Sequence, residues 1–230
     1  MFSEKERAIF SLMLSDSSLP IGGFAFSNGL ESLARIGFLC SYQDFQHYIE
    51  AFSTQINDFD VPYMNSCFQM DSTKEDEQLL ELSNRYHAMV PVPAMRRSSL
   101  VQGASFLRMA NTLHPTLQES VKVNWYMNNL PLSHFCLIWS VCLEHLNFTL
   151  PDIVRLYLFK SVRDQTNAAV RLALLSPTDA MVLQNSMIGY CLRLIECSRE
   201  KTYLQARKTS VLMEIAQGYH RNLYVKLFQS

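Results

Sequence analysis

Residues 15–31 read SDSSLPIGGFAFSNGLE, a stretch that predicts a tight turn between two helices. Ahead of it, apolar side chains fall on one broad face, as in an amphipathic helix. The pair Gly22-Gly23 predicts a tight interhelical turn, because glycine permits positive φ angles and a close approach of two backbones. A second helix then begins after Ser27 or Asn28, either of which can cap it.

The rest of the chain carries the same helical pattern between short turns. Apolar side chains recur three and four residues apart, and the seven glycines and eight prolines are too few for a many-stranded sheet. Gly37 stands where a helix C′ residue is expected. The predicted helices cover residues 2–14, 27–36, 41–56, 59–70, 75–89, 94–113, 117–127, 132–146, 151–175, 176–197 and a last stretch from 202. We therefore expect an all-α fold, a single-domain bundle of about ten helices over residues 1–230, with the apolar stretch 151–175 at its centre.

Composition and charge argue against several classes of function. Hydrophobic residues make up 48% of the chain, enough for a sizeable core. The net charge of −1, without a basic stripe or tail, argues against a nucleic-acid partner. The longest apolar runs end well short of the ~20 residues that span a bilayer, and no secretory signal opens the sequence. Since the six cysteines lack the spacing of a disulfide framework, we expect a cytoplasmic protein with free thiols and no membrane contact.

The strongest metal-ligand pattern is His134, Cys136, Cys142 and His145. On a helix His134, Cys142 and His145 share a face, but eleven residues, or ~16 Å along the axis, separate the two histidines. A zinc or nickel ion holds its ligands at only ~2.0–2.3 Å. Cys142 and His145 can supply two ligands, which do not close a site. We therefore predict buried thiols, hydrogen-bonded histidines and no metal site; the alternative is a direct nickel or zinc carrier that uses Cys142, His145 and other thiols.

The sequence predicts no catalytic residue and no nucleotide site. Gly22-Gly23 follows a helix rather than a strand and lacks the lysine of a phosphate-binding loop. Residues 57–60, NDFD, place their two carboxylates on different helix faces, so we interpret them as the N-terminal cap of the next helix. Residues 163–167, RDQTN, form a polar block inside an apolar helix, which indicates a buried hydrogen-bond network or one exposed turn. A helical enzyme acting on an isoprenoid or similar ligand is the less favoured alternative, because its aspartate-rich magnesium box is missing.

Residues 15–31 also resemble the signature of the UreF family of urease accessory proteins. In that family an N-terminal helix ends in a Leu-Pro-x-Gly-Gly-Phe loop, and Ser-x-Gly-Leu-Glu opens the next helix. Three further segments resemble the family in the same order: Arg96, Ser99 and Gly103; AAVRL at 168–172; and the end of the chain from Tyr219-His220. Two positions depart from the family pattern: Ala94, where members often carry an acidic residue, and Ser176, where a glycine commonly ends a helix. The resemblance nevertheless spans nearly the whole chain.

The resemblance implies a function as well as a fold. Proteins of this family are all-α, usually dimeric, and have no active site of their own. They bind the accessory protein UreD, also called UreH, recruit the GTPase UreG and dock on apo-urease, where GTP hydrolysis is coupled to nickel insertion. For this chain the resemblance implies a non-catalytic homodimer that gates the GTPase, binds no cofactor tightly and handles nickel only within the complex.

Two segments are candidate partner-binding sites. The C-terminal tail, residues 219–230, carries more apolar bulk than a free terminus normally tolerates. Family members meet UreD through this region, so docking in a groove of a partner is favoured over packing on the chain's own domain. In the loop the glycines serve backbone geometry first, Phe24 and Phe26 are candidates for the core, and Glu31 is placed to stabilise a helix start. The candidate partner-binding residues are Pro20, Gly22, Gly23, Phe24, Ser27, Gly29 and Glu31 in the loop, and Tyr219, Leu223, Tyr224, Leu227, Phe228 and Ser230 in the tail.

Overall fold

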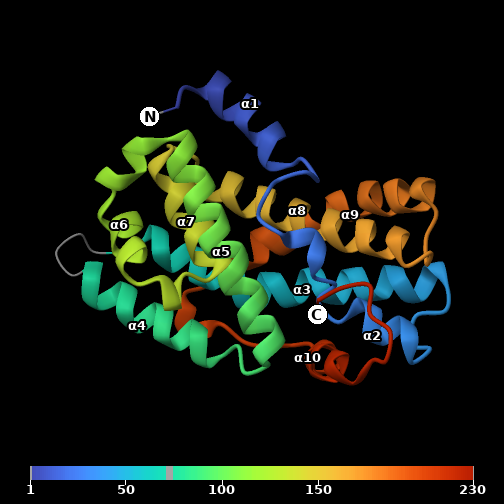
Figure 1. The fold of residues 1–230 in the computed structure, drawn as a ribbon. Helices are drawn as coiled ribbons and strands as arrows, with labels where there is room; N and C mark the ends of the chain where they lie inside the picture. The colour runs from blue at the N-terminus through green and yellow to red at the C-terminus, as the bar shows by residue number, and fades with distance from the viewer. Residues whose placement is uncertain (1, 71–74, 230) are drawn as a thin grey trace.

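The computed structural model describes residues 2–70 and 75–229 and shows an all-α fold (Figure 1). In these residues ten α-helices and five short 3-10 helices, with no strand, make up the regular structure. The α-helices are α1 (Glu4–Leu14), α2 (Leu30–Arg35), α3 (Tyr42–Phe68), α4 (Glu75–Ala88), α5 (Pro93–Leu113), α6 (Val121–Asn128), α7 (Phe135–His145), α8 (Leu150–Arg171), α9 (Pro177–Ser198) and α10 (Val211–Tyr219). The predicted fold class is confirmed. No helix in the described ranges combines the length and the apolar character needed to cross a membrane.

Two hydrophobic cores share the long helices α3 and α8. The first core gathers α4, α5, α6 and α7 around the C-terminal half of α3 and the first half of α8. The second joins α2, α9 and α10 to the N-terminal half of α3 and the last half of α8. Figure 1 shows the first group at one end of the molecule and the second at the other, with α3 running between them. Because α3 and α8 bury apolar side chains in both cores, they hold the two ends together.

Residues 57–60 lie inside a helix and do not cap the start of a new one, so this sequence-based prediction is wrong. Helix α3 runs unbroken from Tyr42 to Phe68 with Pro62 in its interior. Proline has no N–H, so the carbonyl four residues earlier, on Asp58, loses its helical donor. The N–H of Arg207 takes that place and donates to the Asp58 carbonyl oxygen at 3.0 Å. The helix continues because a distant segment satisfies the carbonyl that the proline leaves free.

That distant segment, residues 199–210, lies along α3 as a strap instead of forming the helix predicted from residue 202. Within it only Tyr203–Gln205 forms a 3-10 helix, and α10 begins after it. The Asp58 carboxylate forms ion pairs with Lys201 and Arg207, both at 3.1 Å. The polar residues of the NDFD stretch therefore anchor the strap in the middle of α3, a use that local spacing does not reveal.

Close packing of α5 against the start of α7 accounts for part of the Arg96, Ser99 and Gly103 pattern. A Cβ atom on Gly103 would lie 1.9 Å from the carbonyl oxygen of Ser133, so only glycine fits there. One turn earlier, the Ser99 hydroxyl forms a hydrogen bond with Nδ1 of His134 at 3.1 Å. These two positions set how closely α5 and α7 approach.

The observed helix ends match the sequence-based predictions at some positions and differ from them at others. Gly37 follows α2 with a φ of 76°, as its predicted C′ position requires. After α8 ends at Arg171, the left-handed residue is Ala173 (φ 57°), whereas Ser176 caps α9 through its side chain. Helix α8 is also less enclosed than predicted, because Phe159 is exposed. The helix buried along nearly its whole length is α7.

Candidate partner-binding site

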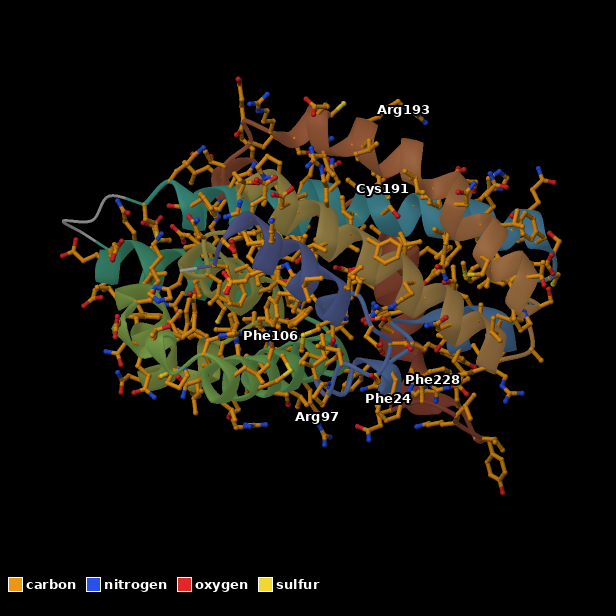
Figure 2. All side chains as sticks on the ribbon, turned by 90° about the horizontal axis from the view of Figure 1, so that it is seen from above. Phe24, Arg97, Phe106, Cys191, Arg193 and Phe228 are labelled. Carbon is orange, nitrogen blue, oxygen red and sulfur yellow. The ribbon has the colours of Figure 1, made fainter. Side chains whose placement is uncertain are left out.

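The loop after α1 and the C-terminal tail meet at one place beside the end of α8. We call it the loop–tail junction: residues 15–31, Arg171 and residues 217–229. The N–H of Gln229 donates to the carbonyl oxygen of Ala25 at 2.8 Å. Figure 2 shows Phe24 of the loop beside Phe228 of the tail. The structure thus brings together the two segments that the sequence singles out, although they lie at opposite ends of the chain.

Two glycines set the path of the loop. Gly22 and Gly29 adopt left-handed φ angles of 77° and 89°. A Cβ atom on Gly29 would lie 3.2 Å from the carbonyl oxygen of Met213 in α10, so this glycine also permits close packing. Gly29 itself occupies the N-cap of α2, without a side-chain cap. The N-cap position is thus Gly29 rather than the predicted Ser27 or Asn28, although the Ser27 hydroxyl still accepts the N–H of Glu31 in the first turn at 3.5 Å. The geometric role of Gly22 and Gly29 is confirmed.

Glu31 binds the tail through a buried carboxylate. Its side chain is 0% exposed, and its Oε1 accepts the N–H of Leu227 at 2.7 Å. Its Oε2 accepts the N–H of Phe228 at 3.1 Å and lies 3.0 Å from Nε2 of His220. Burial acts to raise the pKa of Glu31, but these hydrogen bonds and His220 outweigh it, so the pKa is lowered. The ionised carboxylate is thus the form that holds the tail.

Arg171, at the C-terminal end of α8, contacts both the loop and the tail. Its guanidinium group donates a hydrogen bond to the carbonyl oxygen of Phe24. The guanidinium carbon lies 5.7 Å from the ring centroid of Phe24 and 4.3 Å from that of Phe228, within the range of cation–π attraction. Arg171 is part of the AAVRL segment, whose residues Ala168 and Ala169 are buried in the second core. The segment therefore ties the core to the junction.

The candidate residues divide into buried and exposed groups. Ser27, Gly29, Glu31 and Phe228 are buried; Gly22, Gly23 and Leu223 are half-buried; Pro20, Phe24, Tyr219, Tyr224 and Leu227 are exposed; Ser230 lies outside the described residues. Phe26 belongs to the interior as expected, but Phe24 is 69% exposed. The tail thus packs on its own chain through Phe228 and presents most of its other large apolar side chains outward. Partner binding by these residues stays a prediction.

Comparison with known proteins shows the family of the chain. The family model described as UreF matches residues 39–188, more than half of the chain. The chain belongs to the UreF family. A urease accessory protein F of Arabidopsis thaliana is 27% identical over 220 residues, which cover 94% of this chain and 90% of the relative. One from Oryza sativa subsp. indica is 24% identical over 217 residues, covering 94% and 82%. A urease accessory protein UreF of Lachnoclostridium phytofermentans is 23% identical over 223 residues, covering 95% and 96%.

Sequence reasoning misses three residues of the junction in this UreF-family chain. Arg171 and His220 lie inside segments that resemble the family, but 147 and 189 residues separate them from Phe24 and Glu31, which they contact. Gln217, in α10, donates to the carbonyl oxygen of Asn28. The available signal is weak: Arg171 stands among apolar neighbours, His220 is followed by Arg221 and Asn222, and no local pattern indicates which residues they contact.

The candidate metal ligands in and next to α7 make separate contacts and do not form a metal site. His134 is buried and lies 3.1 Å from both Ser99 Oγ and His87 Nδ1, and burial, with smaller effects of His87 and Arg96, lowers its pKa to about 3. Burial raises the pKa of the Cys142 thiol, which disfavours the thiolate that binds metals. Within residues 2–70 and 75–229, no group of three or more His, Cys, Asp or Glu side chains is arranged to hold an ion. The expected hydrogen-bonded histidine is confirmed for His134.

The two carboxylates of the NDFD stretch also serve separate contacts. Asp58 holds the strap, whereas Asp60 points to α4 and accepts the hydroxyl hydrogen of Tyr86 at 2.6 Å. Burial raises the pKa of Asp60 to about 6, against the lowering effect of that hydrogen bond. One carboxylate faces the strap and the other faces α4, so the two do not form the shared magnesium site that a prenyl-transfer enzyme needs.

Proposed function

We propose that this chain is a non-catalytic accessory protein of urease maturation. It bridges a UreD-like (UreH-like) scaffold and a UreG-like GTPase, and it promotes and gates GTP-dependent nickel insertion into apo-urease. Membership in the UreF family supports the maturation role, as do relatives that carry the name urease accessory protein. In this proposal the chain acts as a cytoplasmic homodimer within the complex, holds no cofactor of its own and leaves nickel to the assembly.

An apolar surface on the loop–tail junction is the observation that carries the proposal. Phe24, Tyr219, Tyr224, Val225 and Leu227 all expose large apolar groups. Exposed apolar patches mark protein contact sites, and tyrosine is enriched among residues that dominate binding energy. The contacts of Glu31 and Arg171 with the tail anchor the backbone beneath this surface. A preformed surface loses less conformational entropy on binding, which favours a specific partner.

Charge on the tail indicates the kind of partner surface. Residues 219–229 include Arg221 and Lys226 and contain no acidic residue. We therefore propose that the tail binds an acidic surface of the UreD-like partner, with apolar contacts at the centre of the interface and charge pairs at its rim. Rim pairs are screened by salt, so association should slow as ionic strength rises.

Co-purification with the UreD-like protein tests this assignment. Tyr224 is fully exposed, so Tyr224→Ala removes almost no packing from the free chain. We expect this variant to bind the UreD-like partner roughly tenfold or more weakly, as for a central interface tyrosine. Met181→Ala, at an exposed apolar position on α9, is the matched control and should bind as the wild type does. Tight complex formation by a chain that lacks residues 219–230 would overturn the assignment.

Urease activity in cells tests the maturation role itself. Cells without this gene are grown with ample and with scarce nickel, and urease activity is compared with the amount of urease protein. Lost activity with apo-urease still present, restored by the wild-type gene, supports the proposal. Unchanged activity under both nickel conditions refutes it.

A further inference from the structure

Arg163, Asp164 and Asn167, three residues of the polar block of α8, line a cavity beneath the loop that follows α1. This cavity has a volume of about 410 Å³ and lies between the loop that follows α1 and the last half of α8. The loop contributes apolar groups such as Ile21 and Phe26, and α8 contributes polar ones. A single water needs only ~10–15 Å³ of such space, so a small molecule has room.

The polar lining forms one stripe along α8. Lys160, Arg163, Asp164, Asn167 and Arg171 are spaced three and four residues apart, which places them on one helix face. The guanidinium groups of Arg163 and Arg171, two turns or ~12 Å apart, each donate to a loop carbonyl, of Ser15 and of Phe24 respectively. The loop is therefore fastened to α8 at both ends and arches over the stripe between them.

Positive charge exceeds negative charge in this lining. Lys160, Arg163 and Arg171 are opposed there by the single carboxylate of Asp164. Its Oδ1 lies 2.8 Å from Arg163 and its Oδ2 lies 2.5 Å from Lys160, so both oxygens are occupied. Arg163 also interacts electrostatically with Asp16, an exposed residue whose carboxylate accepts the N–H of Ser18.

Burial makes this excess of charge costly when the cavity holds only solvent. The side chains of Lys160 and Arg163 are 5% and 9% exposed. Lysine has three N–H donors and arginine five, and the hydrogen bonds found here use one of Lys160 and two of Arg163. Across residues 2–70 and 75–229, Arg171 forms no ion pair with a carboxylate. A second anion beside Asp164 would match these donors and offset the desolvation of the cations.

We propose that the cavity under the loop is a binding site for a small oxyanion, a phosphate or a carboxylate. Lys160 and Arg163 supply charge from one side, Asn167 supplies an amide in the middle of the stripe, and Arg171 closes the far end. Apolar groups of the loop form the opposite wall. The site shares Gly23, Phe24 and Arg171 with the loop–tail junction, but anion binding needs only this chain and can be measured without a urease-maturation partner.

Titration of the purified full chain tests the proposal. Inorganic phosphate and acetate are added separately, in calorimetric experiments at constant ionic strength set with chloride. We expect saturable binding of at least one of them with a stoichiometry of one per chain. Phosphate binding alone would identify a phosphate site, and acetate binding alone a carboxylate site. Absence of saturable binding for both anions up to tens of millimolar would overturn the proposal.

Three variants locate the binding. Lys160→Met keeps the volume and removes the charge, and Asn167→Leu removes the amide at a half-buried position with little risk to folding. Each should weaken binding, Lys160→Met by roughly tenfold or more. Arg193→Met is the matched control, because Arg193 is an exposed arginine on α9, far from Phe24 and Phe228 in Figure 2. Unchanged affinity in both Lys160→Met and Asn167→Leu, with folding checked by circular dichroism, would refute the site.

Discussion

Replacing Glu31 with glutamine tests whether one buried carboxylate holds the C-terminal tail. The substitution keeps size and shape but turns one acceptor oxygen into an N–H donor. The Leu227 N–H faces Oε1, while the Phe228 N–H and the His220 ring face Oε2. Whichever oxygen becomes the amide nitrogen, at least one buried N–H of the tail then faces another donor.

The expected loss follows from the number of contacts. A hydrogen bond to a charged group contributes ~1.5–3 kcal/mol, and a buried donor left unsatisfied costs ~1–3 kcal/mol. Since at least one bond is lost and the others lose their charge, tail docking should weaken by ~2–4 kcal/mol. That change corresponds to a roughly 30- to 700-fold rise in the open population of the tail.

Amide hydrogen exchange measures this opening directly. The peptide covering residues 221–229 should exchange faster in Glu31→Gln by about that factor, while α3 and α7 keep their protection, because the tail can open without global unfolding. Glu196→Gln, at an exposed position of α9, is the control and should leave the tail peptide unchanged. Equal exchange of the tail in Glu31→Gln and in the wild type would refute the idea that Glu31 clamps it.

Three further predictions concern pH and packing. The pKa of Glu31 is lowered from 4.5, so docking of the tail should persist above pH 4.5 and be lost as the pH falls below it, seen as faster tail exchange. Gly103→Ala should destabilise the fold by several kcal/mol (order ~3 or more), because its Cβ would lie 1.9 Å from the Ser133 carbonyl oxygen. Gly189→Ala, whose Cβ would meet only the Arg193 side chain at an ordinary contact distance of 3.6 Å, should be neutral or stabilising in urea unfolding. The pKa of Asp60, about 6, exceeds its usual 3.8, so the folded state binds the proton more tightly than the unfolded state does. The free energy of unfolding should therefore fall by ~3 kcal/mol as the pH rises from about 3.8 to about 6. Asp60→Asn should remove this pH dependence from urea unfolding curves.

Much of the fold follows from local sequence pattern. Apolar spacing of three and four residues identifies the helices, and Gly37 marks the end of α2 where the structure has it. The errors come from long-range contacts. Nothing near Pro62 shows that α3 continues through it, because the N–H that compensates belongs to Arg207, 149 residues beyond Asp58. The absence of an α-helix at residues 202–210 has the same origin, since Tyr203, Arg207 and Thr209 bind side chains and carbonyl groups of α3.

The difference between local pattern and long-range contacts also explains which parts of the site could be predicted from the sequence. Sequence pattern identifies the loop and the tail separately, and glycine chemistry accounts for Gly22 and Gly29. It does not show that Glu31 faces the tail: a glutamate in the first turn of a helix has a sufficient local explanation in the helix dipole. Its use as the acceptor for Leu227 and Phe228 depends on the position of the chain end, which only tertiary packing sets.

Three of the four segments by which the chain resembles the UreF family are parts of one structural unit. The loop supplies Glu31, the AAVRL segment supplies Arg171, and the tail supplies Phe228, and each binds at least one of the others. Each segment alone exposes an unsatisfied group: a carboxylate, a guanidinium group or free backbone N–H groups. Together they satisfy these groups and leave Phe24 and Tyr224 projecting outward. A partner that displaced the tail would have to replace the donors to Glu31, so a surface that binds the tail in place requires less reorganisation than one that extracts it.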